Sequence, residues 1–191
     1  MTAAATVVAD ARVRVRLMVA TEEEYARMAG WLNQPHVREW WDPDGPETTV
    51  EHVRKTYGPA RSEATSGTAC IIEDGGRPVG YLQIYPWSAE TEYMRNVGIS
   101  VEPEAWAFDV FIGEPNALGT GVATRALDLV CRHLVDERHA SAVVIVTEVG
   151  NGRAHHVYEK LGFRKVQEFL DEDTRGGDRV RSYVMRREAA V

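Results

Sequence analysis

The segment formed by residues 118–163 constrains the fold more than any other part of this chain. Small residues stand at positions 119, 121 and 123, at the beginning of a run whose apolar positions recur at helical spacing: Ala123, Leu127, Val130, Cys131 and Leu134. Small side chains there leave free backbone N–H groups open to a ligand, and the helix dipole favours an anion such as pyrophosphate. The pattern predicts an anion-binding turn in front of a helix, although glycine-rich turns also serve plain packing.

Two more elements follow within this segment. The short, almost entirely apolar run 142–146 predicts a strand that is buried on both faces. A helix then begins near Asn151 and places Ala154 and Tyr158 four residues apart on one face. Gly162 is a reasonable C-terminal stop for that helix.

Together, these motifs resemble the GNAT family of acetyl-CoA-dependent N-acetyltransferases. The pyrophosphate loop of that family reads Gln/Arg-x-x-Gly-x-Gly/Ala and precedes a helix, a strand and Asn-x-x-Ala-x-x-x-Tyr-x-x-x-Gly-Phe. Gly121 and Ala123 match the loop, whereas Leu118 stands where the family has Gln or Arg. Leu118 removes one side-chain contact to phosphate and leaves the backbone contacts intact. The resemblance implies the following contacts with acetyl-CoA: Phe111, Ile112, Leu118, Gly119, Thr120, Gly121, Val122, Ala123, Thr124, Asn151, Ala154 and Tyr158.

Length and composition indicate one globular domain over residues 1–191, because 44% apolar and 27% charged residues are ordinary for such a protein. Residues 1–11 leave open a disordered N-terminus. No stretch approaches the roughly 18 apolar residues of a spanning helix, so no membrane is expected and cytoplasmic location is the default. The net charge of −7 argues against a nucleic-acid partner and mildly for a cationic one. Cys70 and Cys131 are interpreted as buried thiols, and no metal site is expected.

Along the chain, strands are predicted at 12–19, 68–73, 78–85 and 105–112, with a closing hairpin of 164–170 and 179–186. A capping box at residues 21–24 opens one helix, and a second, short helix is expected over 49–57. Residues 86–104 form a long connection, of a length that usually carries function or is disordered. This order is that of the GNAT arrangement. The resemblance implies an α/β (α+β) fold with a mixed, strongly twisted sheet of about seven strands and helices on both faces.

The same resemblance implies that the fourth and fifth strands, which end near Ile112 and Thr147, splay apart and admit acetyl-CoA. Tyr158 would lie beside the coenzyme sulfur as the general acid, or it is an ordinary half-buried aromatic on a packing helix. Asn151 would bind the pantetheine arm, cap the helix, or do both. Backbone N–H groups near Phe111 and Ile112 are the expected donors to the thioester oxygen.

Asp109 is the candidate general base or amine-orienting carboxylate. It interrupts a strictly alternating strand, where aspartate is rare, and its position between Ala107 and Phe111 predicts partial desolvation. The alternative is a structural ion pair with an arginine. Glu148 closes the next strand, and either shares a polyamine with Asp109 or is a solvated acid at a strand end.

The N-terminal half narrows the resemblance. Residues 30–41, GWLNQPHVREWW, and 78–85, PVGYLQIY, are similar to the aminoglycoside 6'-N-acetyltransferases. In that group, paired tryptophans lie beside the antibiotic, and aspartates matching Asp109, Glu148 and Asp178 hold its amino groups. The match at Glu148 needs a two-residue deletion and an Asp-to-Glu change. We expect one of the paired tryptophans in the core and the other toward the substrate. The predicted substrate contacts are Trp40, Trp41, Tyr85, Trp87, Glu92, Asp109, Glu148 and Asp178.

The resulting prediction is an acetyl-CoA-dependent aminoglycoside 6'-N-acetyltransferase that confers resistance, as a monomer or homodimer. Transfer would be direct, within a ternary complex, because no activated nucleophile is visible. One alternative is a siderophore-biosynthesis acyltransferase acting on a lysine-derived amine, although that group tends to have His in place of Asp109. Acetylation of a peptide or small polyamine is another. A non-catalytic acyl-CoA-binding module is disfavoured by Asp109, Asn151 and Tyr158 together.

Overall fold

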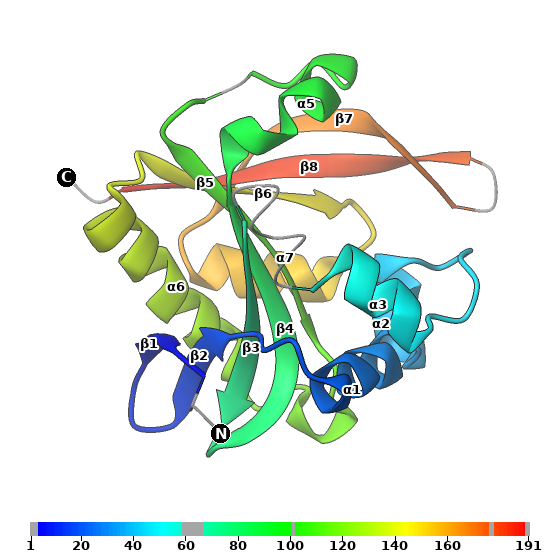
Figure 1. Cartoon of the computed structure of the whole chain (residues 1–191). Coiled ribbons are helices and arrows are strands. Elements are labelled where there is room, and N and C mark those ends of the chain that lie inside the picture. The colour runs from blue at the N-terminus through cyan, green and yellow to red at the C-terminus, as the bar shows by residue number, and fades with distance from the viewer. Residues whose placement is uncertain (1–3, 59–66, 101, 176–177, 190–191) are drawn as a thin grey trace. The chain divides into compact units, whose positions relative to one another are not determined.

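The computed structural model describes residues 4–58, 67–100, 102–175 and 178–189 (Figure 1). The chain divides into two compact units, each built from segments that are distant in sequence. Unit 1 comprises residues 1–84 and 109–130, and unit 2 comprises residues 85–108 and 131–191. In the described residues, strands follow one another in the sheet as β1-β2-β3-β4-β5-β6-β8-β7. The predicted mixed sheet is confirmed, with one strand more than expected; the prediction of a single domain stays a prediction.

Unit 1 contains an antiparallel meander of β1 (Thr6–Ala9), β2 (Val13–Leu17), β3 (Thr68–Asp74) and β4 (Arg77–Pro86). Apolar and basic residues alternate along β2, as the sequence pattern predicts. The end of β5 (Ala105–Ile112) also belongs to this unit, as do η2 (Pro115–Ala117) and the first half of α6 (Val122–Arg138).

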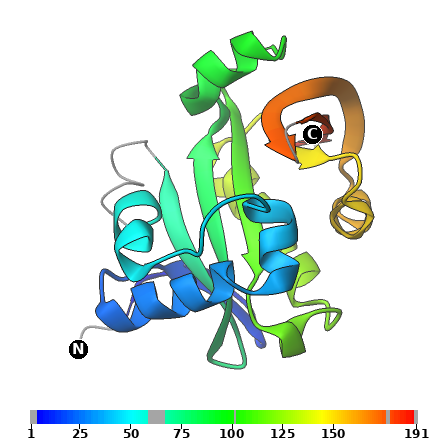
Figure 2. The same cartoon turned by 90° about the vertical axis from the view of Figure 1, so that its right-hand side faces the viewer.

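Three helices pack on one face of this meander: α1 (Glu22–Leu32), α2 (Pro35–Trp41) and α3 (Val50–Thr56) (Figure 2). The apolar residues of α1 are buried there with Val37 and Val53, because their spacing gathers them on one side of the helix. Pro35 begins α2, since proline suits the first position of a helix. Thr49 caps α3 by accepting a hydrogen bond from His52 N.

Unit 2 is built around β6 (Ala142–Glu148). Its first three residues pair in parallel with 105–107 of β5, and its whole length pairs antiparallel with β8 (Asp178–Glu188). Residues 142–145 are buried, which confirms the prediction of a strand covered on both faces. Within unit 2 the last paired residues of β5 and β6 are Ala107 and Val144, in keeping with the predicted divergence of the two strands.

The remaining elements of unit 2 are η1 (Trp87–Glu90), α5 (Thr91–Asn96), the second half of α6, α7 (Gly152–Lys160) and β7 (Arg164–Arg175). β7 pairs antiparallel with β8. A second core joins η1, α5 and the sheet, and contains Trp87, Met94, Ile99, Ala105, Ala107, Ala142, Val144, Phe169 and Val184. No helix among the described residues is long and apolar enough to cross a membrane.

The N-terminal segment requires a correction. Residues 6–9, which were left open to disorder, form strand β1. The cause is Asp10, whose Oδ1 accepts hydrogen bonds of 2.8 Å from both Arg12 N and Val13 N and so returns the chain alongside β2. These backbone bonds, with a further bond from Arg125, lower the pKa of Asp10 to about 2. Residues 1–3 of the predicted segment lie outside the described residues.

Two other connections are more regular than expected. The segment 86–104 contains η1 and α5, because Met94 and Ile99 anchor it in the core of unit 2; residue 101 lies outside the described residues. The closing hairpin was expected to have a tip over residues 171–178. Its strands instead extend to Arg175 and from Asp178, and the intervening 176–177 are not described.

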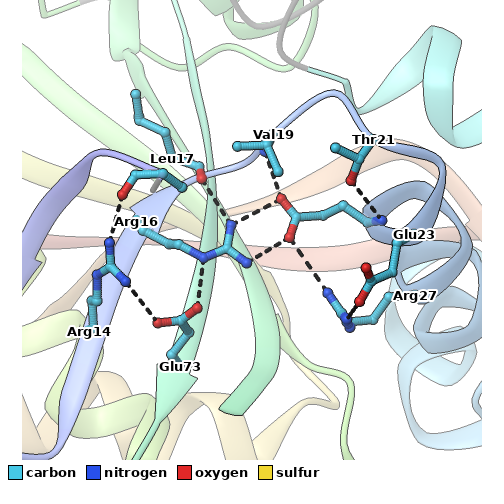
Figure 3. A network of polar contacts seen from close by, with 10 residues as sticks. Arg14, Arg16, Leu17, Val19, Thr21, Glu23, Arg27 and Glu73 are labelled. Atoms are coloured by element: carbon cyan, nitrogen blue, oxygen red, sulfur yellow. Dashed lines mark hydrogen bonds and ion pairs between the residues drawn. The ribbon is translucent and has the colours of Figure 1, made fainter. Parts of the chain in front are cut away.

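A buried ionic network joins the meander of unit 1 to α1 (Figure 3). Arg16 lies on β2, and its guanidinium donates to both carboxylate oxygens of Glu24 on α1, at 2.6 and 3.0 Å, and to Glu73 on β3 at 2.7 Å. All three residues are buried, at 3–7% exposure. The bonds to Glu24 raise the pKa of Arg16, so the guanidinium stays charged.

The same network explains why the expected capping box is only half formed. Thr21 accepts a hydrogen bond from Glu24 N at 3.3 Å, as predicted. The Glu24 carboxylate, however, accepts from Val19 N at 2.6 Å and from Arg16, instead of from Thr21 N. The need to neutralise a buried guanidinium outweighs the return bond of the capping box.

We predict that Arg16→Ala destabilises the protein by about 3–5 kcal/mol, because two buried carboxylates lose their counter-charge. The matched control is Arg12→Ala, which removes a bidentate ion pair with Asp74 from the same β2–β3 region but at an Arg side chain that is 44% exposed. The control should lose far less stability. Chemical denaturation of both variants measures the difference, and equal losses would contradict the role given to the network.

Candidate active site

The turn before α6 has the conformation that its glycines predict. Gly119 and Gly121 have φ values of 74° and 84°, in the left-handed region that side chains disfavour. A Cβ added at either position would meet no atom within 4 Å, so the space beside this backbone is open. The glycines are therefore required by the shape of the turn, and the turn leaves a ligand room to approach.

Within the described part of the protein, this turn leaves its last amide groups without an acceptor. Thr120 closes the turn by donating through Oγ1 to the Ala117 carbonyl at 2.8 Å, and the first helical bond runs from Arg125 N to the Gly121 carbonyl at 3.0 Å. Among the described residues, the N–H groups of residues 121–124 have no acceptor. Such N–H groups at a helix N-terminus suit an anion.

The second motif also folds as predicted. Asn151 caps α7, because its Oδ1 accepts from Ala154 N at 3.1 Å. Gly162 ends the helix with φ 84°, and Phe163 N donates to the Tyr158 carbonyl at 3.0 Å. Tyr158 is 9% exposed, and its ring lies 6.2 Å from the ring of Phe108 and 5.9 Å from that of Phe163. Both ends of the helix and its aromatic face fix the tyrosine.

The end of β5 is held by α1 and α2 within unit 1. The His36 ring donates from Nε2 to the Ile112 carbonyl at 2.9 Å, and the Trp31 indole donates to Glu114 at 2.8 Å. A Cβ at Gly113 would lie 2.0 Å from the Trp31 ring, so only glycine fits there. These contacts fix the backbone at residues 111–112, where amide donors to a thioester were predicted.

The paired tryptophans differ in their surroundings. Trp41 packs on the core of unit 1, with ring distances of 4.9 Å to Phe111 and 6.4 Å to Tyr81. Its indole donates to the Tyr57 hydroxyl at 3.0 Å. Trp41 therefore takes the expected core role. Trp40 is half-buried, and its contact with a substrate stays a prediction.

Asp109 is exposed, contrary to the expected partial desolvation. Its neighbours on the same strand face are buried, but Ala107 belongs to the core of unit 2 and Phe111 to the core of unit 1. Neither core extends over the carboxylate that lies between them in sequence. Burial raises the pKa of the Tyr57 and Tyr81 hydroxyls, and the charge of Asp109 raises both further, which places this carboxylate near the aromatic cluster.

The other predicted substrate residues lie in unit 2. Glu148 ends β6 and is half-buried, while Asp178 at the beginning of β8 and Glu92 in the first turn of α5 are exposed. Tyr85 is half-buried and packs against the core of this unit. Trp87 is only 2% exposed and belongs to that core, so its placement argues against the predicted contact with a substrate.

Both cysteines are buried, as predicted. Burial raises the pKa of the Cys70 thiol to about 12, which makes it a poor nucleophile. Within the described part of the chain, no three His, Cys, Asp or Glu side chains gather closely enough to hold a metal ion.

Residues 20–170 match the family described as the acetyltransferase (GNAT) domain, and this match spans most of the chain. The chain belongs to the GNAT acetyltransferase family. It is an N-acetyltransferase that uses acetyl-CoA, as its motifs predicted.

Relatives of this GNAT enzyme include the aminoglycoside N(6')-acetyltransferases type 1 of Klebsiella pneumoniae and Serratia marcescens. Each is 26% identical over 167 residues, which cover 83% of this chain and 78% of the relative. Among solved structures, AAC(6')-Ib with coenzyme A and kanamycin has a TM-score of 0.78 and 25% identity, and covers 92% of this chain and 94% of its own. AAC(6')-Ib with ribostamycin and coenzyme A has a TM-score of 0.79 and 25% identity, with coverage of 92% and 93%.

Sequence reasoning missed two tertiary arrangements in this GNAT enzyme, each of which contains tyrosine. Tyr57 and Tyr81 join Trp41 near Asp109, although they lie on different elements. Tyr93 on α5 donates to the carboxylate of Asp171 at 3.0–3.1 Å, and Asp171 is 4% exposed. No spacing of residues in the sequence predicts either arrangement, because both depend on tertiary packing.

We predict that Asn151→Ala and Thr49→Ala each cost about 1 kcal/mol of unfolding free energy, because each removes the N-cap of a short helix. Only Asn151→Ala should also weaken coenzyme A binding, by about three- to tenfold, as expected for one lost hydrogen bond. Denaturation gives the first quantity and titration calorimetry the second. If the two variants bind coenzyme A with equal affinity, Asn151 only caps α7 and does not contact the coenzyme.

Proposed function

We propose that this GNAT enzyme is an aminoglycoside 6'-N-acetyltransferase that transfers an acetyl group directly from acetyl-CoA to an amino group of the antibiotic and so confers resistance. The observation that carries the proposal is the exposed carboxylate of Asp109 beside the aromatic cluster of Trp41, Tyr57 and Tyr81. An accessible carboxylate next to aromatic rings suits an ammonium group, and flat rings also suit a sugar.

The relatives support the same substrate class. Those that share 26% identity over most of this chain are named as aminoglycoside N(6')-acetyltransferases, and AAC(6')-Ib has been solved with kanamycin and with ribostamycin. Aminoglycosides are polycations, so several carboxylates are needed to hold one. Asp109, Glu148, Asp178 and Glu92 would supply them, and the net charge of −7 favours the approach of a cation.

The turn before α6 fits the coenzyme. Acetyl-CoA supplies the acetyl group as a thioester. The N–H groups of residues 121–124 would hold its pyrophosphate, because they have no acceptor among the described residues and the glycines leave the approach open. Leu118 offers no polar group, so the backbone of the turn must provide this binding alone. Asn151 would add a hydrogen bond to the pantetheine arm while it caps α7.

The chemistry follows from the remaining residues. Asp109 would orient the substrate ammonium and accept the proton that the amine must lose before or during its attack on the thioester carbonyl. Amides near Phe111 and Ile112, held by His36 and Trp31, would donate to the carbonyl oxygen as negative charge grows there. The carbon–sulfur bond breaks as the carbon–nitrogen bond forms, and the Tyr158 hydroxyl would give the leaving sulfur its proton.

We predict coenzyme-thiol release with kanamycin and ribostamycin, and markedly less with spermidine, hydroxylysine or a lysine-containing peptide. The amines are compared at equal concentrations with the same enzyme preparation, and the position of the acetyl group is determined by NMR of the product. The proposal fails if the aminoglycosides are inert while another of these amines turns over.

Two substitutions test the assigned roles. Asp109→Asn should lower kcat/KM by about a hundredfold or more, because it removes a proton acceptor and a charge. Tyr158→Phe keeps the ring between Phe108 and Phe163 and should lower kcat by a similar factor. The control Asp136→Asn removes one negative charge at an exposed position of α6 and should leave both constants within about twofold. Full activity in Asp109→Asn would remove that residue from its role.

A further inference from the structure

The turn between β6 and α7 is tied together at a single backbone oxygen. The Glu148 carbonyl accepts from Asn151 N at 3.0 Å and from His155 Nε2 at 2.9 Å. Glu148 is a proposed substrate carboxylate, and Asn151 is the proposed pantetheine contact. The Glu148 carbonyl oxygen therefore links the end of β6 to α7, which Asn151 caps.

His155 lies on the face of α7 that carries the candidate residues. Residues 151, 155 and 158 are four and three apart, so they form one stripe along the helix. Within α7, His155 and Tyr158 are the two buried residues. A contact that holds His155 against β6 thus determines which way this face of α7 points. It thereby determines where Tyr158 lies.

The surroundings keep the His155 ring neutral and oriented. Because a carbonyl oxygen only accepts, the ring donates from Nε2. His155 is 7% exposed, and its ring meets the Tyr183 ring edge to face at 5.5 Å. Desolvation lowers the pKa of His155, and the positive charge of Lys165, which lies 4.5 Å above the Tyr183 ring, lowers it further.

We propose that His155 is a positioning residue of the transferase: its buried imidazole fastens α7 to the end of β6, so that Glu148, Asn151 and Tyr158 keep one fixed arrangement. The roles of Glu148 and Tyr158 rest on the proposed function. His155 itself would contact neither substrate and would act through the backbone of Glu148. A hydrogen bond of this kind matters because small displacements of reacting groups cost large factors in rate.

The test compares His155→Leu, which removes the donor, with His155→Gln, which keeps an N–H donor on a flexible side chain. The matched control is His156→Leu, at the adjacent and exposed histidine of the same helix. For each variant, the dissociation constant of coenzyme A is measured by calorimetry and the kinetic constants by thiol release with kanamycin, at a temperature where denaturation shows the variant folded.

The expected result for His155→Leu is a coenzyme A dissociation constant raised about fivefold and a kcat/KM lowered about tenfold or more, as for the loss of one buried hydrogen bond. His155→Gln should recover at least half of each loss on a logarithmic scale, and His156→Leu should match the wild type. The proposal is overturned if the His155 variants lose stability while both constants stay within twofold of the wild type.

The two proposals fail separately. If kanamycin is inert in every variant but His155→Leu alone weakens coenzyme A binding, the substrate assignment is wrong and the positioning of α7 stands. If kanamycin turns over equally in His155→Leu and His156→Leu, the aminoglycoside activity stands and the positioning role is wrong. Coenzyme binding gives the readout that needs no acceptor.

The pH dependence of stability and of coenzyme affinity supplies an independent readout. Lys165 on β7, Glu159 on α7, the Glu148 carbonyl on β6 and Tyr183 on β8 face the ring. Because the folded pKa of His155 is below the unfolded value of 6.5, the stability that the neutral ring provides is complete above that value. It is lost as pH falls through the lower folded pKa. Between pH 7.5 and 5.5, the wild type should therefore lose more stability and more coenzyme affinity than His155→Gln, and equal losses would count against the proposal.

Discussion

The buried guanidinium of Arg16 is the interaction on which unit 1 depends. A charge removed from water is tolerable only when its counter-charges are fixed, and here they come from two other elements, Glu24 on α1 and Glu73 on β3. The helix is thereby set in position on the meander. That position places Trp31 against the end of β5 and, through α2, brings His36 to the Ile112 carbonyl. The geometry proposed for the thioester site thus begins with an ion pair far from it in sequence.

Strand β5 contributes residues to the cores of both units, but Asp109 belongs to neither core. Ala107 is buried in unit 2 and Phe111 in unit 1, while the carboxylate between them remains in contact with solvent. A carboxylate in contact with solvent is accessible to an ammonium group of a substrate. The nearby rings of Tyr57 and Tyr81 then add an apolar surface without removing the charge from water. This arrangement suits binding and orientation of a polycation first, and proton transfer second.

The parts of the molecule that the sequence predicted are those whose signals are local. The turn before α6 and both ends of α7 follow from glycine conformations and a side-chain cap, which depend on neighbours in the chain. The placements of Trp87 and Asp109 did not follow, because exposure is decided by which distant residues cover a side chain. Strand β1 escaped prediction because the Asp10 turn, rather than an apolar pattern, directs it to β2. The local conformations at the motif residues were therefore predicted, while the cluster around Tyr57 and Tyr81 was not.

Helix α7 illustrates why a short element near a reacting group needs more than its caps. Nine residues are too few for an isolated helix to be stable in water, so its direction is set by tertiary contacts. Asn151 and Gly162 define where it begins and ends. The buried face supplies the missing restraint, with Tyr158 between Phe108 and Phe163 and His155 on the Glu148 carbonyl. Because a hydrogen bond to a carbonyl is directional, the histidine adds to this aromatic packing a contact that relates α7 to the end of β6.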